Sequence, residues 1–194
     1  MFYLFALIAS LFAAAPAVPA QAQGNRAEAV FAGGCFWCTE SDFDKIPGVI
    51  STTSGYTGGK VLDPTYEQVS GGGTGHIEAV KIVYDPRKVS YGTLAQRFFR
   101  TIDPLDGGGQ FCDRGYQYRS AIFVANAAQR VAAEAAKNQA AAALKQPVAT
   151  LILPAAKFYP AEGYHQDYYK KNPVRYRYYR FSCGREARLK KVWG

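Results

Sequence analysis

The segment GGCFWCTE at residues 33–40 most constrains the fold of this chain, because it joins an apolar run to a helical pattern through two glycines. The apolar run at 28–33 is typical of a buried strand, and apolar residues recur at helical spacing after it. The pattern predicts a strand at about 28–33 and a helix at about 35–45. Cys35 would open that helix, where unpaired backbone N–H groups and the helix dipole favour a thiolate. Cys35 is therefore a candidate nucleophile.

Cys35 and Cys38 also have less reactive interpretations. Two cysteines three residues apart can be small buried hydrophobic residues, or half of a metal site. A core residue is not needed at a glycine-flanked junction of strand and helix, so the pattern favours chemistry. Phe36 and Trp37 flank the thiol directly. They predict a hydrophobic pocket for a small apolar group.

The rest of the chain alternates predicted strands with predicted helices. Apolar and β-branched runs predict further strands at about 49–53, 76–84, 120–124 and 150–153. Helical spacing predicts helices at about 90–99, 127–145 and 164–169, and Ser90 and Asn126 are the predicted N-caps of the first two. This order predicts an α/β fold (an α+β sandwich) with a ferredoxin-like split βαβ core, in which helices cover a mixed open sheet.

Two irregular segments separate these elements. One is glycine-rich and spans 55–75, and the other is polar and aromatic and spans 110–119. Long loops inside a compact domain are usually functional. Both segments abut predicted strand ends, as Cys35 does, so we expect them to converge with Cys35 into one site.

Glu78 lies in the predicted strand 76–84, where every second residue shares a face. Val80 and Ile82 are on the same face as Glu78. A carboxyl forced toward an apolar layer has a raised pKa, which suits it to act as an acid near neutral pH. The alternative is an exposed strand end, on which Glu78 and Lys81 are ordinary surface residues.

The N-terminus resembles a secretory signal. Residues 2–18 are almost wholly apolar, and small residues follow at 18–22, although no Lys or Arg precedes the run. An uncleaved membrane anchor is the weaker alternative, because the run is short and Pro16 and Pro19 interrupt it. We therefore expect export, with no stable membrane association after cleavage.

Cleavage after Ala20 or Ala22 would satisfy the small-x-small rule. The expected organisation is a signal peptide at 1–22 and a single domain at 23–194, in a periplasmic or secreted protein. Disulfides can persist there. The chain has four cysteines, too few for a disulfide scaffold of this length, so they predict redox chemistry or one structural bridge: Cys35, Cys38, Cys112 and Cys183.

The formal net charge is +8, and much of it lies in a basic C-terminal tail at 170–191. Tyr176, Tyr178 and Tyr179 are interleaved with its arginines, a combination also found in nucleic-acid-binding segments. A solvated basic face is the commoner outcome, and export separates the chain from nucleic acid. We therefore expect no nucleic-acid partner.

The chain resembles the peptide methionine sulfoxide reductase A family. The motifs are spread in family order over roughly residues 28–173, and they are specific jointly rather than singly. They are GCFW at 34–37, GYTGG at 55–59, PTY at 64–66, TGHIEAV at 74–80, DP at 85–86, QYRS at 117–120 and YHQ at 164–166.

The resemblance implies thiol-dependent reduction of the S epimer of methionine sulfoxide, free or in proteins, and so repair of oxidised proteins. Chemistry agrees, because a sulfoxide needs a proton donor at its oxygen before a thiol can attack its sulfur. By resemblance Cys35 is the nucleophile and Glu78 the acid. By resemblance, Tyr66 and Tyr118 donate hydrogen bonds to the sulfoxide oxygen, and Asp113 supports the polar network. Phe36 and Trp37 form an apolar pocket for the S-methyl group.

Attack by Cys35 should leave a sulfenic acid, which a second thiol can condense with to form a disulfide. Cys183 is the expected resolving residue because a tail can swing over the site, and Cys38 is the local alternative. Cys112 is expected to be a buried thiol near the site. An external thioredoxin-like dithiol would then reduce the disulfide. We expect a monomer, with no metal or other cofactor.

Two other functions compete with this one. The first is a general thiol–disulfide oxidoreductase that uses Cys35 and Cys38, which gives Glu78 no purpose. The second is a metal-binding module with Cys35, Cys38, His76 and His165 as ligands, but it lacks the compact second ligand pair of strong zinc sites.

Overall fold

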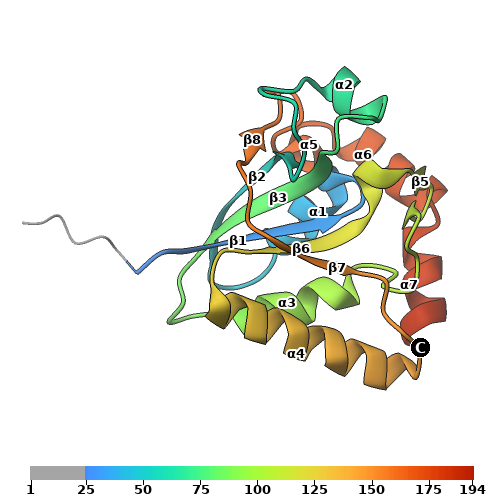
Figure 1. The fold of residues 1–194 in the computed structure, drawn as a ribbon. Helices are drawn as coiled ribbons and strands as arrows, with labels where there is room; N and C mark the ends of the chain where they lie inside the picture. Colours follow the sequence, from blue (N-terminus) through green and yellow to red (C-terminus); the bar gives the residue numbers. More distant parts are fainter. Residues whose placement is uncertain (1–24) are drawn as a thin grey trace, which may run out of the picture.

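The structure is a computed structural model that describes residues 25–194, so the predicted signal peptide at 1–22 lies outside the described residues. Its centre is a six-stranded sheet in the order β7-β6-β1-β3-β2-β8 (Figure 1). β6 and β7 are parallel, and all other neighbours are antiparallel. The strands are β1 (Ala27–Gly33), β2 (Val49–Thr57), β3 (Ile77–Tyr84), β6 (Ser120–Val124), β7 (Leu151–Pro154) and β8 (Tyr159–Pro160).

The central four strands form two interlocked split βαβ units. β3 lies between β1 and β2, which are joined through helix α1 (Phe36–Phe43). β1 lies between β3 and β6, and the connection from β3 to β6 includes helix α3 (Tyr91–Arg100). The predicted ferredoxin-like core with a mixed sheet is confirmed.

One face of the sheet carries the main hydrophobic core. Alternation along β1 and β3 places Phe31, Val80 and Ile82 on this face, where α1, α3 and α4 (Ala127–Leu144) pack. Phe31 is fully buried, and its ring centroid lies 5.0 Å from that of Phe43 and 5.1 Å from that of Phe98. Figure 1 shows α3 and α4 side by side along the sheet.

Local sequence signals explain where these helices begin. The side chains of Ser90 and Asn126 accept hydrogen bonds from the backbone at the starts of α3 and α4, as predicted. Thr65 and Gln68 form a capping box at the short helix α2 (Tyr66–Ser70), which lies inside the glycine-rich segment.

Three boundaries differ from the prediction. β2 continues to Thr57, beyond the expected end of the strand at 53, because its last residues pair with β3. The helix predicted at 164–169 is α5 (Tyr168–Lys171), and turns precede it. The segment at 110–119 is not wholly irregular, since β4 (Gly109–Gln110), β5 (Asp113–Arg114) and the 3₁₀ helix η1 (Tyr116–Tyr118) lie within it or at its edge.

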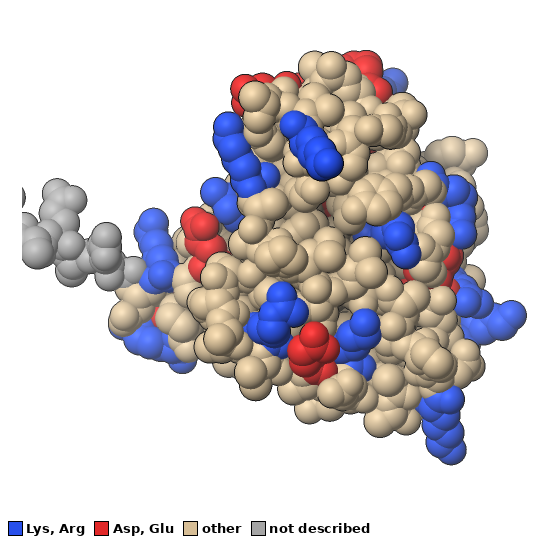
Figure 2. Space-filling view, in the orientation of Figure 1, with Lys and Arg blue, Asp and Glu red and all other residues tan. Residues whose placement is uncertain are grey.

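The basic tail forms two helices, α6 (Pro173–Ser182) and α7 (Arg185–Trp193), which pack beside β5 (Figure 1). The predicted solvated basic face is wrong for part of this tail. Arg185 is 2% exposed and donates to the carbonyl oxygen of Thr101, and Arg180 forms an ion pair with Asp42 at 2.8 Å. In the view of Figure 2, Lys and Arg side chains are scattered and do not gather into one patch.

No helix among residues 25–194 is long and apolar enough to cross a membrane.

Candidate active site

The ends of several strands meet at one edge of the sheet, and the topology explains why. Because β1 is antiparallel to β3 and β6, the end of β1 lies beside the starts of both neighbours: Phe31 pairs with Val80, and Gly33 pairs with Ser120. The end of β2 reaches the same edge, where Tyr56 pairs with Glu78. Cys35 follows β1 directly, so the fold brings the thiol to Glu78.

The turn into α1 depends on Gly34. Its φ is +80°, and a Cβ there would lie 2.5 Å from Cβ of Gln110. Cys35 is the N-cap residue of α1, and its carbonyl oxygen accepts from the N–H groups of Cys38 and Thr39. The glycine is therefore required for Cys35 to leave the strand at this angle.

Glu78 is 2% exposed, and its Oε2 accepts the N–H of Phe36 at 3.0 Å. Burial raises its pKa to about 8, with a further contribution from Asp113. The predicted raised pKa is confirmed, and the alternative of an exposed strand end is wrong. Glu78 is a neutral acid at pH 7 and can donate a proton into the site.

Cys35 does not have the thiolate-favouring environment that the helix terminus predicted. Burial, Cys38, Glu78 and Asp113 raise its pKa well above the ordinary value. The first N–H of α1, that of Phe36, is occupied by Glu78. Cys38 instead has a pKa lowered to about 7, by its hydrogen bond to Cys35 and by Arg185 and Arg180. Tertiary neighbours thus outweigh the helix dipole.

Tyr66 from α2 and Tyr118 from η1 line the same pocket as Cys35 and Glu78. Burial and Glu78 raise the pKa of Tyr66 to about 12 and also raise that of Tyr118. Both phenols therefore stay protonated and can donate hydrogen bonds to a substrate oxygen. Glu162 supports the arrangement by accepting the N–H of Tyr66 at 2.8 Å.

Phe36 and Trp37 form an apolar wall of the site, and His165 contacts both of them. The indole N–H of Trp37 donates to Nδ1 of His165 at 3.0 Å, and Tyr168 stacks on the indole at 3.7 Å. The ring of His165 also lies 4.9 Å from that of Phe36. Burial lowers the pKa of His165, which favours the neutral ring that accepts this bond. Sequence reasoning did not give His165 this role, although it lies in the YHQ motif.

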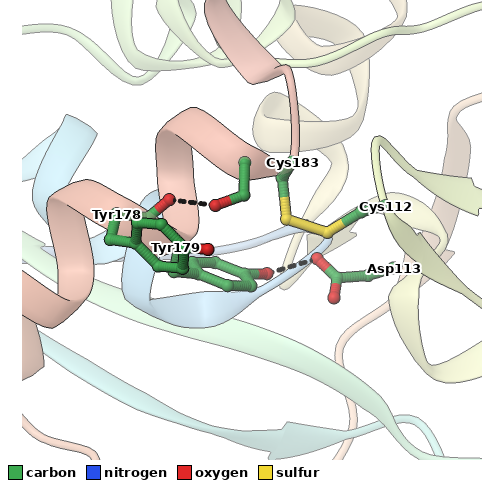
Figure 3. Close-up of a disulfide and its surroundings, with 6 residues drawn as sticks. Cys112, Asp113, Tyr178, Tyr179 and Cys183 are labelled. Atoms are coloured by element: carbon green, nitrogen blue, oxygen red, sulfur yellow. Dashed lines mark hydrogen bonds between the residues drawn. A yellow bond between two sulfur atoms is a disulfide. The ribbon is translucent and has the colours of Figure 1, made fainter.

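Asp113 from β5 meets Tyr179 from α6. The hydroxyl of Tyr179 donates to Oδ2 of Asp113 at 2.5 Å (Figure 3). Burial raises the pKa of Asp113. Tyr179 was missed as a site residue, because no sequence signal distinguishes it from the other tyrosines of the tail.

One small pocket collects these groups. It is lined by Cys35, Phe36, Trp37, Tyr66, Glu78, Asp113, Tyr118 and Tyr179. The predicted site residues therefore lie together, except Cys183, which is adjacent. Their chemical roles stay predictions.

The cysteines form one bridge and one free pair. Cys112 and Cys183 form a disulfide with Cα atoms 4.9 Å apart (Figure 3). Cys35 and Cys38 are free thiols. The interpretation of Cys112 as a buried thiol is wrong, since it is exposed and paired. The choice of Cys183 as the resolving residue stays a prediction.

The four ligands of the competing metal site are not gathered. Among residues 25–194 the one group of His, Cys, Asp and Glu close enough to share an ion is Cys112, Asp113 and Cys183, and the disulfide occupies both of its sulfurs. The ring of His76 is engaged by the N–H of Gly59 and faces the carbonyl oxygen of Val61 at 2.8 Å.

Comparisons with known proteins agree with this geometry. The family model described as peptide methionine sulfoxide reductase matches residues 27–194. A relative from Rhizobium meliloti, peptide methionine sulfoxide reductase MsrA 2, is 51% identical over 98% of this chain and 93% of its own length. The protein of the same name from Caulobacter vibrioides is 54% identical over 95% of this chain and 96% of its own.

Among solved structures, reduced Mxr1 from Saccharomyces cerevisiae matches with a TM-score of 0.74 and 32% identity, over 77% of this chain and 87% of the yeast chain. Methionine sulfoxide reductase A of Corynebacterium diphtheriae matches with a TM-score of 0.69 and 36% identity, over 79% and 78%. The chain thus belongs to the peptide methionine sulfoxide reductase family and is an enzyme that reduces methionine sulfoxide to methionine, as its motifs predicted.

Proposed function

We propose that this chain reduces the S epimer of methionine sulfoxide with Cys35 as nucleophile and Glu78 as general acid. The observation that carries the proposal is the shared pocket, in which a buried thiol and a carboxyl with a pKa of about 8 lie against an apolar wall. An ionisable side chain is costly to bury, and the hydrogen bond that Glu78 accepts from the N–H of Phe36 does not require a carboxyl group.

The proposed step moves one oxygen atom. Glu78 donates a proton to the sulfoxide oxygen, aided by hydrogen bonds from Tyr66 and Tyr118. The Cys35 sulfur attacks the activated centre, takes the oxygen and becomes a sulfenic acid, while methionine leaves. The thiol proton of Cys35 restores Glu78, so no external oxidant or reductant enters this step. Phe36 and Trp37 hold the S-methyl group and select one epimer.

In the proposed recycling, oxidation passes from Cys35, the inner thiol, to the Cys112–Cys183 pair, the outer disulfide. Cys183 condenses with the Cys35 sulfenic acid, which forms a disulfide and releases water. The thiol of Cys112 then attacks Cys183 and releases Cys35, which leaves the Cys112–Cys183 pair that the structure contains. Asp113 lines the pocket together with Cys35. A carboxylate oxygen of Asp113 also lies within 4.8 Å of the sulfur atoms of Cys112 and Cys183, so this disulfide is next to the pocket.

The proposed external reductant is a thioredoxin-like dithiol, which becomes oxidised as it reduces the outer pair. Cys112 is exposed, so a partner protein has access to the disulfide. Mxr1, the yeast neighbour, has also been solved in complex with Trx2. A metal or prosthetic group has no part in the proposed steps.

Single turnovers on each epimer of a methionine sulfoxide peptide test the assignment. The wild-type chain should form methionine from the S epimer only, and Cys35→Ser should form none. Cys38→Ser is the matched control, since it removes the other free thiol of α1 and should still complete one turnover. Methionine formation by Cys35→Ser, or its loss in Cys38→Ser alone, would contradict the proposal and favour a C-x-x-C oxidoreductase.

We further propose that the protein is exported, on the basis of the apolar run at 2–18 and the small residues after it. Expression in a Gram-negative host should yield a mature periplasmic chain that begins at Gln21 or Gln23, as measured by intact mass. An unprocessed chain in the cytoplasm would contradict export. The monomeric state and the lack of membrane and nucleic-acid partners stay predictions, which light scattering and flotation assays can test.

A further inference from the structure

The hydroxyl group of Tyr179 lies where the C-terminal helices reach the pocket. It donates to Asp113 at 2.5 Å, and Tyr179 lines the same small pocket as Cys35. The ring meets the indole of Trp37 edge-on, with centroids 5.7 Å apart. Tyr179 therefore contacts the carboxyl and the apolar wall of the site, and it shares the pocket with the thiol.

The hydroxyl group of Tyr179 stays protonated. Burial, together with the negative charges that Cys35 and Asp113 can carry, raises its pKa. A phenol in this state is a hydrogen-bond donor across the working pH range. It has one proton, which it donates to Asp113 in this structure, so a hydrogen bond to the Cys35 sulfur would replace the bond to Asp113.

Cys35 needs such a donor. The first N–H of α1 does not supply one, because it is bonded to Glu78. Burial and the surrounding acids disfavour charge on the sulfur, yet the thiol becomes negatively charged when it loses its proton to become the attacking nucleophile. A preorganised donor beside the sulfur offsets that cost.

We propose that Tyr179 is a further catalytic residue, whose hydroxyl group turns from Asp113 to donate a hydrogen bond to the Cys35 sulfur as negative charge develops there. The inference rests on the proposed role of Cys35. Tyr179 transfers no proton and forms no covalent bond, so the balance of the oxygen-transfer step is unchanged.

The position of Tyr179 is fixed by contacts outside the pocket. The N–H of Cys183 donates to the carbonyl oxygen of Tyr179 one helical turn earlier, and Cys183 is bonded to Cys112, the neighbour of Asp113 (Figure 3). A helical turn, a disulfide and the Tyr179–Asp113 hydrogen bond thus close a ring between α6 and β5. The ion pair of Arg180 with Asp42 holds the same turn against α1.

Tyr179→Phe removes the hydroxyl group and keeps the ring, and the adjacent Tyr178→Phe is a matched control because Tyr178 is 75% exposed. Single turnovers with saturating sulfoxide should be at least about tenfold slower in Tyr179→Phe, since a hydrogen bond to a charged group is lost. The KM should change little, and Tyr178→Phe should stay within about twofold of wild type.

Alkylation separates this role from a structural one. In a Cys38→Ser background, the pH midpoint for alkylation of Cys35 by iodoacetamide should rise by about one unit in Tyr179→Phe, because the thiolate loses a donor. A wild-type turnover rate or an unmoved midpoint would overturn the inference, as would an equal effect of Tyr178→Phe. Cys35→Ser in the same assay distinguishes the two proposals. If Cys35→Ser is inactive while Tyr179→Phe matches wild type, the role of Tyr179 alone fails; activity in Cys35→Ser refutes the proposed function.

Discussion

Replacing Glu78 with glutamine should stabilise the folded protein while it removes the proton donor. Glutamine can accept the same N–H from Phe36 but cannot ionise. The pKa of Glu78 rises from an ordinary 4.5 to about 8 in the folded chain. Each pKa unit is worth about 1.4 kcal/mol, so the ionised form costs up to about 5 kcal/mol of stability.

The raised pKa of Glu78 determines whether stability rises or falls with pH, and over which pH range. A carboxyl with a raised pKa binds its proton more tightly when folded, so stability is full below about pH 4.5 and falls until about pH 8. Wild type should therefore lose about 3 kcal/mol more than Glu78→Gln between pH 5 and pH 8. Single-turnover activity should fall by a factor of about 10² to 10⁴ in the same variant.

Urea unfolding at pH 5, 6.5 and 8, with the Cys112–Cys183 disulfide intact, measures the difference. Glu134→Gln on α4 is the control, because Glu134 is about half exposed and should leave the pH dependence as in wild type. Equal pH slopes for wild type and Glu78→Gln would refute the burial argument. So would a Glu78→Gln variant that is less stable than wild type at pH 8.

The other predictions concern the core and the recycling step. Phe31→Ala should lower the free energy of unfolding by about 4 kcal/mol, because its buried ring stacks on Phe43 and Phe98; a loss under 1 kcal/mol in urea unfolding would contradict this packing. Cys183→Ser should complete one turnover at the wild-type rate and then stall when a protein dithiol is the reductant. Continued multiple turnover in that assay would exclude Cys183 from recycling.

The sheet and half of the site could be predicted from the sequence because their signals are local. Two-residue alternation placed Glu78 on the core face with Val80 and Ile82, and the glycines before Cys35 marked a strand-to-helix junction. The extra length of β2 could not be predicted, since its last residues form a strand through pairing with β3 and β8. A glycine-rich segment predicts turns, because the sequence does not show which strands will pair with it.

The contribution of the tail could not be predicted because it depends on partners far away in the chain. Charged residues in a sequence indicate solvent exposure, but Arg185 is buried through its contacts with Thr101 and Asp42. The pairing of Cys112 with Cys183, 71 residues apart, has no local signature. The pKa of Cys35 also depends on acids brought from β3 and β5, which a helix-dipole argument omits.

Trapping the oxidised form of Cys35 tests the central claim most directly. In Cys38→Ser with the outer disulfide intact, Cys35 is the one remaining free thiol, so its sulfenic acid has no partner. One turnover on the S epimer, followed by dimedone and peptide mass spectrometry, should place one adduct on Cys35 for each methionine formed. Methionine formed without an adduct on Cys35 would contradict the claim that this sulfur takes the oxygen.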